Sequence, residues 1–378
     1  MSKPHIRSIS LDNFGFVGMK TVAEYKRLDE LCHLNMGQSP DSNSYNDNGE
    51  GLPFYQGNAD FGVIHPEVRV WCNAPTKIVD EGSLLISVRA PIGALNIANE
   101  RCCIGRGLAG ITSKDGVNQK YIYYCLKGKN RELNAKGTGS TFKAIAKNAL
   151  GEVLVKVVSE EEQEKIVFSL DKITTIIESR KQQLQELDNL VKARFVEVFG
   201  DLNLNPKGYD VKKLSEIAEY WNGLTYRPED IAADGTVVLR SSNIQNSQLD
   251  FADVVRVNCA ITDRKYVKSN DILMCSRNGS ARLVGKVALI KGLSEPMSFG
   301  AFMMIIRSKY YSYLMTLFQL PFFREQIATS ATTTINQITV KMLDDIKVPV
   351  PDINTLNKFT IFVEEIDKSK VIGLKRVS

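Results

Sequence analysis

Apolar residues recur at alternating spacings of four and three over residues 159–199. The spaced positions are 166, 170, 173, 177, 180, 184, 187, 191 and 194, and seven of these nine are apolar, with arginine at 180 and 194. This is a heptad pattern, typical of helices that pack along one stripe. Ser159 and Glu162 form a capping box, and Gly200 ends the run. The pattern predicts a helix of about 40 residues, roughly 60 Å long. Such a helix is a coiled coil or a rod between domains, the alternative being a long helix on a single domain.

A second amphipathic helix is predicted near the end of the chain, starting in residues 357–370. It is only about half as long as the central helix, so a contact between the two covers only part of the central helix. The residues expected to pack in this contact are Ile166, Leu170, Ile173, Ile177, Leu184, Leu187, Val191, Phe362 and Ile366.

The sequence before the long helix is repeated after it. Five segments match in the same order, with offsets between 186 and 195 residues. The matching pairs are Lys26–Leu31 with Lys212–Ile217, Val79–Arg89 with Val267–Arg277, Ile111–Lys114 with Ile306–Lys309, Thr138–Ile145 with Ala331–Ile338, and Leu150–Val157 with Leu343–Val350. This order indicates a tandem duplication of a domain of roughly 140 residues. Each copy is predicted to contain short strands, then a helix with an aromatic stretch (121–124 and 310–313) that belongs to the core, and a final alternating strand.

The predicted fold class is α/β, more strictly α+β, with two tandem similar domains separated by long helices. The expected parts are an unassigned segment 1–20, a first domain 21–158, the central helix 159–200, a second domain 201–352 and a short distal helix 353–378.

Charge is unevenly spread along this chain. The 378 residues carry a net charge of +5, but residues 159–201 hold ten acids and six bases, which leaves +9 for the remainder. Basic regions on either side of an acidic segment indicate a polyanionic partner, the alternative being a solvated surface with a chance bias. Seven cysteines without disulfide-like spacing and only three histidines predict reduced cytosolic thiols and no structural metal site. No apolar run approaches about 18 residues, so no membrane span is expected.

Motifs for catalysis are missing from the sequence. Gly105–Gly110 (GRGLAG) fits a dinucleotide fingerprint, but it leads into a strand-like stretch, Leu108–Thr112, and we interpret it as a structural turn. Lys136–Lys143 lacks the Gly-Lys-Ser/Thr ending of a phosphate-binding loop. A domain copied twice without a catalytic set favours binding over catalysis.

These features together resemble the DNA-specificity subunits of type I restriction-modification systems. The matching stretches are the Lys-Leu-x-Glu-Ile opening at 213–217, the Ser/Thr-rich loop before an isoleucine, the Leu-x-x-Ile-x-Val-Pro-Val strand at 343–350 and the Glu-Glu-Gln-Glu-Lys-Ile helix start at 161–166. The resemblance covers residues 25–378, and residues 1–20 have no counterpart in it.

The resemblance implies two target-recognition domains, each reading one half of a bipartite site in double-stranded DNA, with antiparallel helices as spacers. It implies two modification (methyltransferase) subunits that use S-adenosylmethionine, and restriction (translocase/nuclease) subunits that use ATP and Mg²⁺. The chain itself is expected to be non-catalytic, without cofactor or metal, in a prokaryotic cytoplasm. The uncovered part of the central helix is expected to bind a modification subunit, unless the chain is truncated. A fused type II restriction or methyl-transfer enzyme, and a coiled-coil scaffold that does not bind DNA, stay open as alternatives.

Candidate DNA-reading residues are polar side chains on loops between strands, because loops on a rigid scaffold carry binding. Arginine can contact guanine with two hydrogen bonds, asparagine can do so with adenine, and lysine and hydroxyl groups suit phosphates or base edges. The candidates of the first domain are Gln56, Asn58, Arg89, Lys136, Thr138, Ser140, Thr141 and Lys143. Those of the second domain are Arg240, Asn243, Arg277, Asn278, Thr332, Thr333, Thr334 and Asn336, in a cluster that also holds Ser242.

Overall fold

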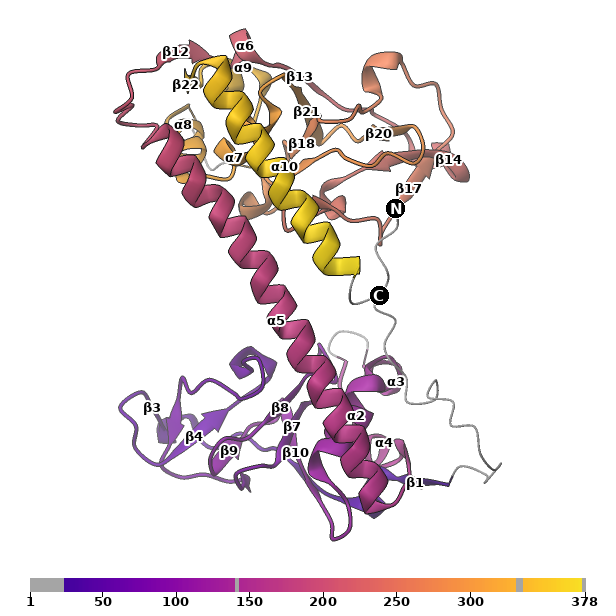
Figure 1. Cartoon of the computed structure of the whole chain (residues 1–378). Coiled ribbons are helices and arrows are strands. Elements are labelled where there is room, and N and C mark those ends of the chain that lie inside the picture. Colours follow the sequence, from indigo (N-terminus) through magenta and orange to yellow (C-terminus); the bar gives the residue numbers. More distant parts are fainter. Residues whose placement is uncertain (1–23, 140–142, 331–335, 376–378) are drawn as a thin grey trace. The chain divides into compact units, whose positions relative to one another are not determined.

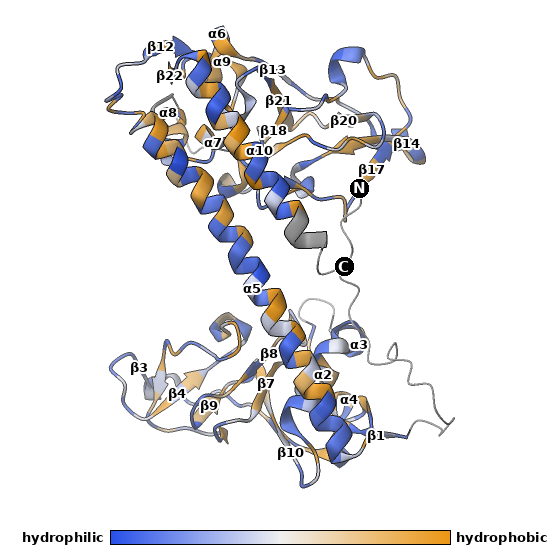
Figure 2. Cartoon of the chain, viewed as in Figure 1, coloured by the Kyte–Doolittle hydropathy of each residue, from blue (hydrophilic) through white to orange (hydrophobic). Residues whose placement is uncertain are grey.

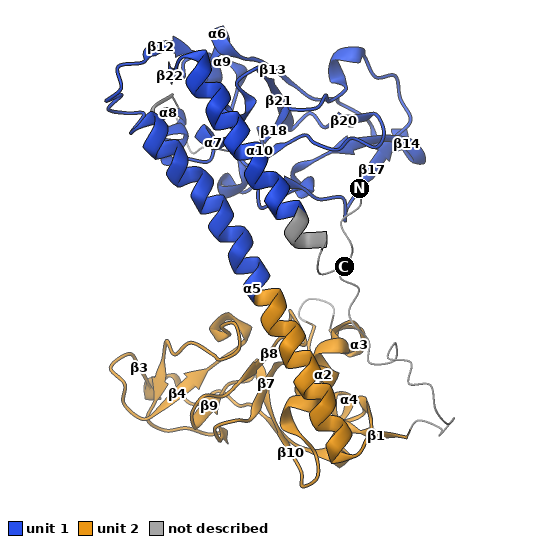
Figure 3. Ribbon diagram, in the orientation of Figure 1, with its two compact units in different colours: residues 1–4, 179–378 blue, residues 5–178 orange. Residues whose placement is uncertain are grey.

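A computed structural model of the chain describes residues 24–139, 143–330 and 336–375 (Figure 1). The chain forms two compact units, and the boundary between them lies after Glu178, inside the long helix (Figure 3). Each unit contains one copy of the duplicated segment.

The first unit is built on two small sheets. A four-stranded antiparallel sheet has the order β2 (Cys32–Met36), β10 (Leu108–Ser113), β7 (Leu84–Ser87), β8 (Leu95–Ile97). A five-stranded sheet has the order β3 (Tyr45–Asn46), β5 (Trp71–Cys72), β4 (Leu52–Tyr55), β9 (Cys102–Ile104), β6 (Ile78–Val79), and β1 (Tyr25–Arg27) pairs with β11 (Leu154–Lys156). The helices are α1 (Leu28–Leu31), α2 (Gln119–Gly128), α3 (Asn130–Lys136) and α4 (Lys147–Gly151).

The second unit repeats this plan. Its four-stranded sheet has the order β13 (Glu219–Asn222), β21 (Met303–Arg307), β18 (Ile272–Cys275), β19 (Val287–Leu289). A three-stranded sheet has the order β17 (Val255–Val257), β14 (Ile231–Leu239), β20 (Met297–Phe299), β15 (Ile244–Gln245) pairs with β16 (Gln248–Leu249), and β12 (Asp210–Lys213) pairs with β22 (Lys347–Val350). The helices are α6 (Leu214–Ile217), α7 (Tyr311–Leu317), α8 (Pro321–Ser330), α9 (Val340–Asp344) and α10 (Ile353–Lys375).

Strands β7 and β18 occupy equivalent places and are buried on both faces. In β18, Ile272 and Met274 belong to one apolar cluster, whereas Leu273 and Cys275 belong to another. Successive side chains of a strand point to opposite faces, so a strand covered on both sides is apolar at every position. This explains why both strands read as continuous apolar runs and match each other closely.

The aromatic stretches after each sheet belong to the core, as predicted. Tyr121 and Tyr313 are each 2% exposed. Each hydroxyl donates a hydrogen bond to the last strand of its own copy, Tyr121 to the Lys156 carbonyl at 2.8 Å and Tyr313 to the Pro349 carbonyl at 2.6 Å. The repeated contact shows that the duplication extends to individual buried polar groups.

The long helix α5 runs from Glu160 to Phe199, and Figure 2 shows hydrophobic and hydrophilic residues interspersed along it. The Glu162 amide donates to Ser159 Oγ at 3.3 Å, and Gly200 follows with φ +76, as the capping signals predicted. Within the first unit, the buried Gln163 side chain receives a hydrogen bond from the Asn118 amide and donates to two carbonyls, those of Gly116 and Val158. These bonds fix the start of the helix on the domain that precedes it.

The end of α5 packs in the second unit on an aromatic cluster that the heptad pattern did not identify. Phe195 and Phe199 are fully buried against Tyr313 and against Phe359 of α10. Phe195 and Phe199 are four residues apart and so lie on the same face of α5. This face meets both the core of the second unit and α10.

The residues predicted for the helix–helix contact have mixed outcomes. Val191 packs against the core of the second unit, and the Phe362 ring lies 6.0 Å from the Arg194 guanidinium. Ile166 is a correction: it packs against the core of the first unit, which includes α2, and not against the distal helix, because the first turns of α5 lie on that domain. The other predicted positions are half-buried, and their role in the contact stays a prediction; they are Leu170, Ile173, Ile177, Leu184, Leu187 and Ile366.

Candidate nucleic-acid interface

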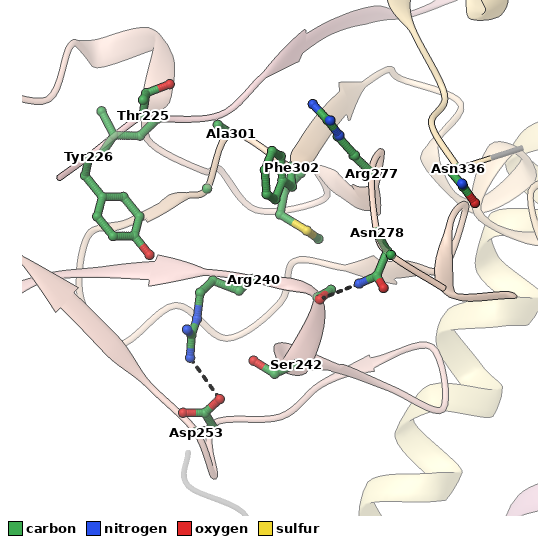
Figure 4. A pocket seen from close by; sticks show the side chains of 15 residues that line it. Thr225, Tyr226, Arg240, Ser242, Asp253, Arg277, Asn278, Ala301, Phe302 and Asn336 are labelled. Atoms are coloured by element: carbon green, nitrogen blue, oxygen red, sulfur yellow. Dashed lines mark hydrogen bonds and ion pairs between the residues drawn. The ribbon is translucent and has the colours of Figure 1, made fainter. Parts of the chain in front are cut away.

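A groove opens in the second unit where several strands end (Figure 4). The ends of β13, β14 and β18 meet there with the turn between β20 and β21. Its volume is about 1140 Å³, above the range of about 300–1,000 Å³ usual for small-molecule sites. The lining residues are Leu224, Thr225, Tyr226, Arg240, Ser241, Ser242, Asp253, Arg277, Asn278, Gly279, Gly300, Ala301, Phe302, Met303 and Asn336.

Close backbone packing forms the floor of this groove. The Gly223 amide donates to the Met303 carbonyl at 3.1 Å, and the Leu224 amide donates to the Phe299 carbonyl at 2.7 Å. A Cβ on Gly223 would lie 2.2 Å from the Phe299 and Gly300 oxygens, so glycine is required. Lys265 Nζ donates to the Asn222 and Gly223 carbonyls. Burial, followed by the nearby charge of Arg264, lowers the pKa of Lys265.

Arg240 stands at the end of β14 and faces an acid across the groove. Its guanidinium contacts Asp253 at 2.8 Å. Arg240 Nε and Ser242 Oγ are buried, and neither has a hydrogen-bond partner among the described residues. Buried polar atoms without partners are uncommon in folded proteins. Both atoms are closed to solvent, so a ligand in the groove reaches them only if the side chains around them move.

Arg277 and Asn278 follow β18 and lie on the other side of the groove. Asn278 Nδ2 donates to Ser241 Oγ at 3.2 Å, which links the ends of β14 and β18. The Arg277 guanidinium lies 5.3 Å from the centre of the Phe302 ring and makes no ion pair with the described residues. Together with Asp253, these side chains present hydrogen-bond donors and acceptors that suit base edges and phosphates.

The first unit places an equivalent set of strand ends together. The Gly37 amide donates to the Leu108 carbonyl at 2.9 Å, as Gly223 does to Met303. The second residue after each equivalent strand forms a backbone bridge to a later loop, Arg89 with Ala144 and Arg277 with Gln337. Gln56, Arg89 and Lys143 are exposed at these positions. The two copies therefore share a backbone arrangement and this arginine, whereas other side chains at the strand ends differ, such as Gln56 and Arg240.

The structure brings only some of the predicted residues together. Arg240, Arg277, Asn278 and Asn336 line one groove. Lys136 ends α3, the backbone of the exposed Thr138 pairs with Ala144, and Asn58 begins a short 3-10 helix after β4. The remaining candidates lie outside the described residues; they are Ser140, Thr141, Thr332, Thr333 and Thr334.

Asn243 is a correction to the predicted set. It is 1% exposed, and its Oδ1 accepts from the Arg240 amide at 2.8 Å. Its Nδ2 donates to the carbonyls of Asp250 and Asp253, both at 2.8 Å. Since both side-chain atoms are occupied inside the loop, Asn243 shapes the groove and does not read a base.

Two residues at the site escaped the sequence analysis. Phe302 lies in the turn between β20 and β21, and the exposed Arg106 lies in the matching turn between β9 and β10 of the first unit. The sequence signal was present in Gly105 and Gly300, which share the offset of 195 seen for the following strand. As expected, the glycines of 105–110 lead into a strand, β10, rather than into a helix.

The described part of the chain has neither a candidate metal cluster nor a candidate membrane span. No group of three or more His, Cys, Asp or Glu side chains there is placed to hold a metal ion. No helix among the described residues is long and apolar enough to cross a membrane.

The sequence matches the family model described as the type I restriction modification DNA specificity domain twice, at residues 21–189 and 206–375. A Methanocaldococcus jannaschii protein provisionally described as the type I restriction enzyme MjaX specificity subunit is 43% identical over 165 residues, which cover 43% of this chain and 39% of that protein. The MjaIX specificity subunit of the same organism is 24% identical over 80% of this chain and 74% of its own length. The S subunit of the type I system from M. genitalium has the same fold, with a TM-score of 0.53 at 15% identity over 96% of this chain and 94% of its own.

Proposed function

Because the chain belongs to the family of type I restriction-modification DNA specificity domains, with one domain in each half, we propose that it selects the DNA sequence on which a type I complex acts. Each domain would read one half of a bipartite site in double-stranded DNA. The observation that carries the proposal is the pair of equivalent strand-end surfaces, which have one backbone frame and different polar side chains.

The chemistry of these surfaces supports reading of DNA. Arginine, asparagine and acidic side chains distinguish base edges in the major groove, and lysine neutralises phosphates. The groove of the second unit offers Arg240, Arg277, Asn278 and Asp253, and the first unit offers Gln56, Arg89, Arg106 and Lys143 at the equivalent strand ends. The two sets differ, which fits an asymmetric site with two unrelated halves.

Helix α5 is proposed as the spacer between the two half-sites. The ten acids and six bases of residues 159–201, the segment that contains α5, disfavour contact with the phosphate backbone. A continuous helix of 40 residues is also a suitable ruler, because half-site spacing in DNA-binding proteins follows from protein geometry.

The chain is proposed to act with other subunits in the cytoplasm of a prokaryotic cell. Two modification subunits would use S-adenosylmethionine to methylate adenine, and restriction subunits would use ATP and Mg²⁺. We assign no catalytic group, cofactor or metal to this chain. The exposed part of α5, which includes Phe168 at 61% and Ile176 at 50% exposure, is the surface proposed to bind a modification subunit.

Sequencing of methylated bases tests this proposal directly. The chain is expressed with its modification subunit in a host without other adenine methylation, and the genome is read for methylated adenines. The expected result is one bipartite motif, absent when either protein is omitted. Methylation that persists with this chain alone would indicate a fused enzyme. Absence of any motif, together with DNA binding that does not respond to salt, would indicate a scaffold that does not bind DNA.

A further inference from the structure

Phe302 is an exposed aromatic residue in the groove of the second unit. Its side chain is 59% exposed although it is large and apolar. It lies in a tight turn in which the Met303 amide donates to the Gly300 carbonyl at 2.8 Å. The core of the second unit does not need this ring, so its exposure requires another explanation.

The backbone next to Phe302 fixes the start of the Arg277 side chain from two sides. The Phe302 carbonyl accepts hydrogen bonds from the Ser276 amide at 2.9 Å and from the Arg277 amide at 3.1 Å. On the opposite side, the Ile338 amide donates to the Ser276 carbonyl at 2.7 Å. The Cα of Arg277 is therefore held in place before any ligand binds.

The ring orients the rest of the arginine. The Arg277 guanidinium lies 5.3 Å from the centre of the Phe302 ring, within the range of a cation–π contact, and Figure 4 shows the two side chains next to each other. Among the described residues Arg277 makes no ion pair, whereas Arg240 is paired with Asp253. The donors of Arg277 are thus available while its orientation is restricted.

We propose that Phe302 is a positioning residue that holds Arg277 in the orientation in which it contacts one guanine of the second half-site. This deepens the proposed function and rests on it. A free arginine loses conformational freedom when it binds a base edge, and that loss weakens binding. A guanidinium already held over a ring loses less, and its fork can face O6 and N7 of guanine together.

The first unit has no aromatic residue at the position equivalent to Phe302, so the proposed positioning of an arginine by a ring applies to the second half-site only. The residue equivalent to Phe302 is Gly107, whose carbonyl accepts from the Val88 amide at 2.9 Å. A Cβ on Gly107 would lie 2.2 Å from the Gln56 carbonyl oxygen, so no aromatic side chain fits there. Arg89 consequently has no ring at that position, and the turn carries Arg106 instead.

The test uses the full chain assembled with its modification subunit and a duplex that carries the methylated motif. Arg277→Ala first identifies the base pair that Arg277 reads, because replacement of that base pair lowers the affinity of the unaltered chain but not that of the variant. Phe302→Leu is then expected to lower affinity for the motif roughly 5- to 20-fold. Phe302→Leu should not change the affinity for a duplex in which that base pair has been replaced. Discrimination between bases should therefore fall at that base pair only. Phe302→Tyr, which keeps the ring, should restore discrimination, and Phe302→Leu should add nothing in an Arg277→Ala background.

Phe251→Leu is the matched control, because Phe251 is exposed in the same unit but does not line the groove. Equal losses on all duplexes for Phe302→Leu, additive losses with Arg277→Ala, or no rescue by tyrosine would each overturn the proposal while the proposed function stands. The same holds if Arg277→Ala alters no single base pair. If the unaltered complex recognises no motif, the proposed function and this inference fail together.

Discussion

Arg240 and Arg277 are both arginines at strand ends of one groove, but their surroundings differ. Arg240 is 2.8 Å from Asp253, whereas Arg277 rests on Phe302 without an ion pair among the described residues. When DNA binds, a guanidinium in an ion pair must give up or share its contact with the carboxylate. A guanidinium over an aromatic ring can bind DNA and keep its contact with the ring. We therefore expect Arg277 to contribute more to base discrimination than Arg240.

The first prediction separates a base contact from a phosphate contact. Arg277→Ala should relax the choice of one base in the second half-site, at a cost of about 1–3 kcal/mol. Lys143→Ala should weaken binding on all sequences and lower the salt slope by about one unit. Both are measured by binding titrations at several salt concentrations. Lys181→Ala, on the exposed surface of α5, is the control and should leave the salt slope unchanged. Equal losses on specific and random DNA would reassign Arg277 to phosphate contact.

The second prediction concerns Asn243 as a structural residue. Asn243→Ala removes one acceptor and two donor contacts in a side chain that is 1% exposed. Buried backbone groups left without partners should lower the free energy of unfolding by about 1–3 kcal/mol. Urea denaturation of the full chain measures this, and Asn278→Ala is the half-buried control with a smaller expected loss. A normal stability combined with an altered base preference would restore Asn243 as a reading residue.

The site was predictable from sequence where polar residues follow a matched strand or cluster in a loop. Arg277 was found in the first way and Arg240 in the second, because strand ends fix the loops that carry binding. Asn243 was misassigned because a loop asparagine that caps its own turn has the same sequence signature as one that faces a ligand. Phe302 was missed because exposed aromatic residues cannot be distinguished from core residues by composition.

At the scale of single elements, α5 is joined to the second unit mainly by aromatic packing. Phe195, Phe199, Tyr313 and Phe359 form five ring contacts with centroid separations between 4.7 and 5.6 Å. Towards the end of α10, Lys370 Nζ contacts Asp188 of α5 at 2.6 Å. The buried rings should contribute most of the stability here, since partly exposed ion pairs contribute little.

The third prediction tests this joint. Phe359→Ala should lower the free energy of unfolding of the second unit by about 3–5 kcal/mol, because it leaves a cavity among three other rings. Ile361→Ala, two residues along the same helix and 56% exposed, should change it by about 0.5 kcal/mol or less. Chemical denaturation followed by circular dichroism measures both variants. Similar losses for the two would show that α10 does not depend on the aromatic cluster.

The elements themselves were largely predictable, and their packing partners were not. The capping signal at Ser159 and the glycine at 200 correctly bounded α5, since these signals act locally. The heptad spacing, however, assumed that another helix lies along the stripe. Phe195 and Phe199 lie off that spacing because they face a domain core, which a helical period alone cannot identify.

At the scale of the whole molecule, the duplicated domains share a frame but have separate cores. The clusters around Ile272 and Leu273 contain residues of the second unit only, and those around Leu84 and Leu85 contain residues of the first. Side chains on one reading surface can therefore change without loss of packing in the other copy. This independence supports the proposal that each domain reads its own half-site.

The fourth prediction follows from the separate cores. Exchange of residues 21–158 for the equivalent domain of a relative should replace one half of the methylated motif and leave the other half intact. The methylated motif of the chimaera, expressed with the same modification subunit, is read by sequencing. As a control, an exchange back to the original domain should restore the first motif. A simultaneous change of both halves would show that the domains do not read independently.

The fifth prediction concerns α5 as a spacer. Four residues inserted between Arg180 and Leu184 lengthen the helix by roughly 6 Å and nearly preserve its apolar face. The insertion leaves intact the contacts of Gln163 at one end and of Asp188, Phe195 and Phe199 at the other. Since one base pair rises roughly 3.4 Å, the unread gap between the half-sites should grow by about one or two base pairs while both half-sites keep their sequences.

The matched control for this spacer test is the same insertion after Gly292, in the loop between β19 and β20. A Cβ at Gly292 would meet nothing within 4 Å, so the loop has room for extra residues. This variant should keep the original gap, since the helix is unchanged. Methylated-base sequencing compares the two variants in the presence of the modification subunit. If the α5 insertion also kept the original gap with full activity, the helix would not set the spacing, and the distance between half-sites would have to come from the partner subunits.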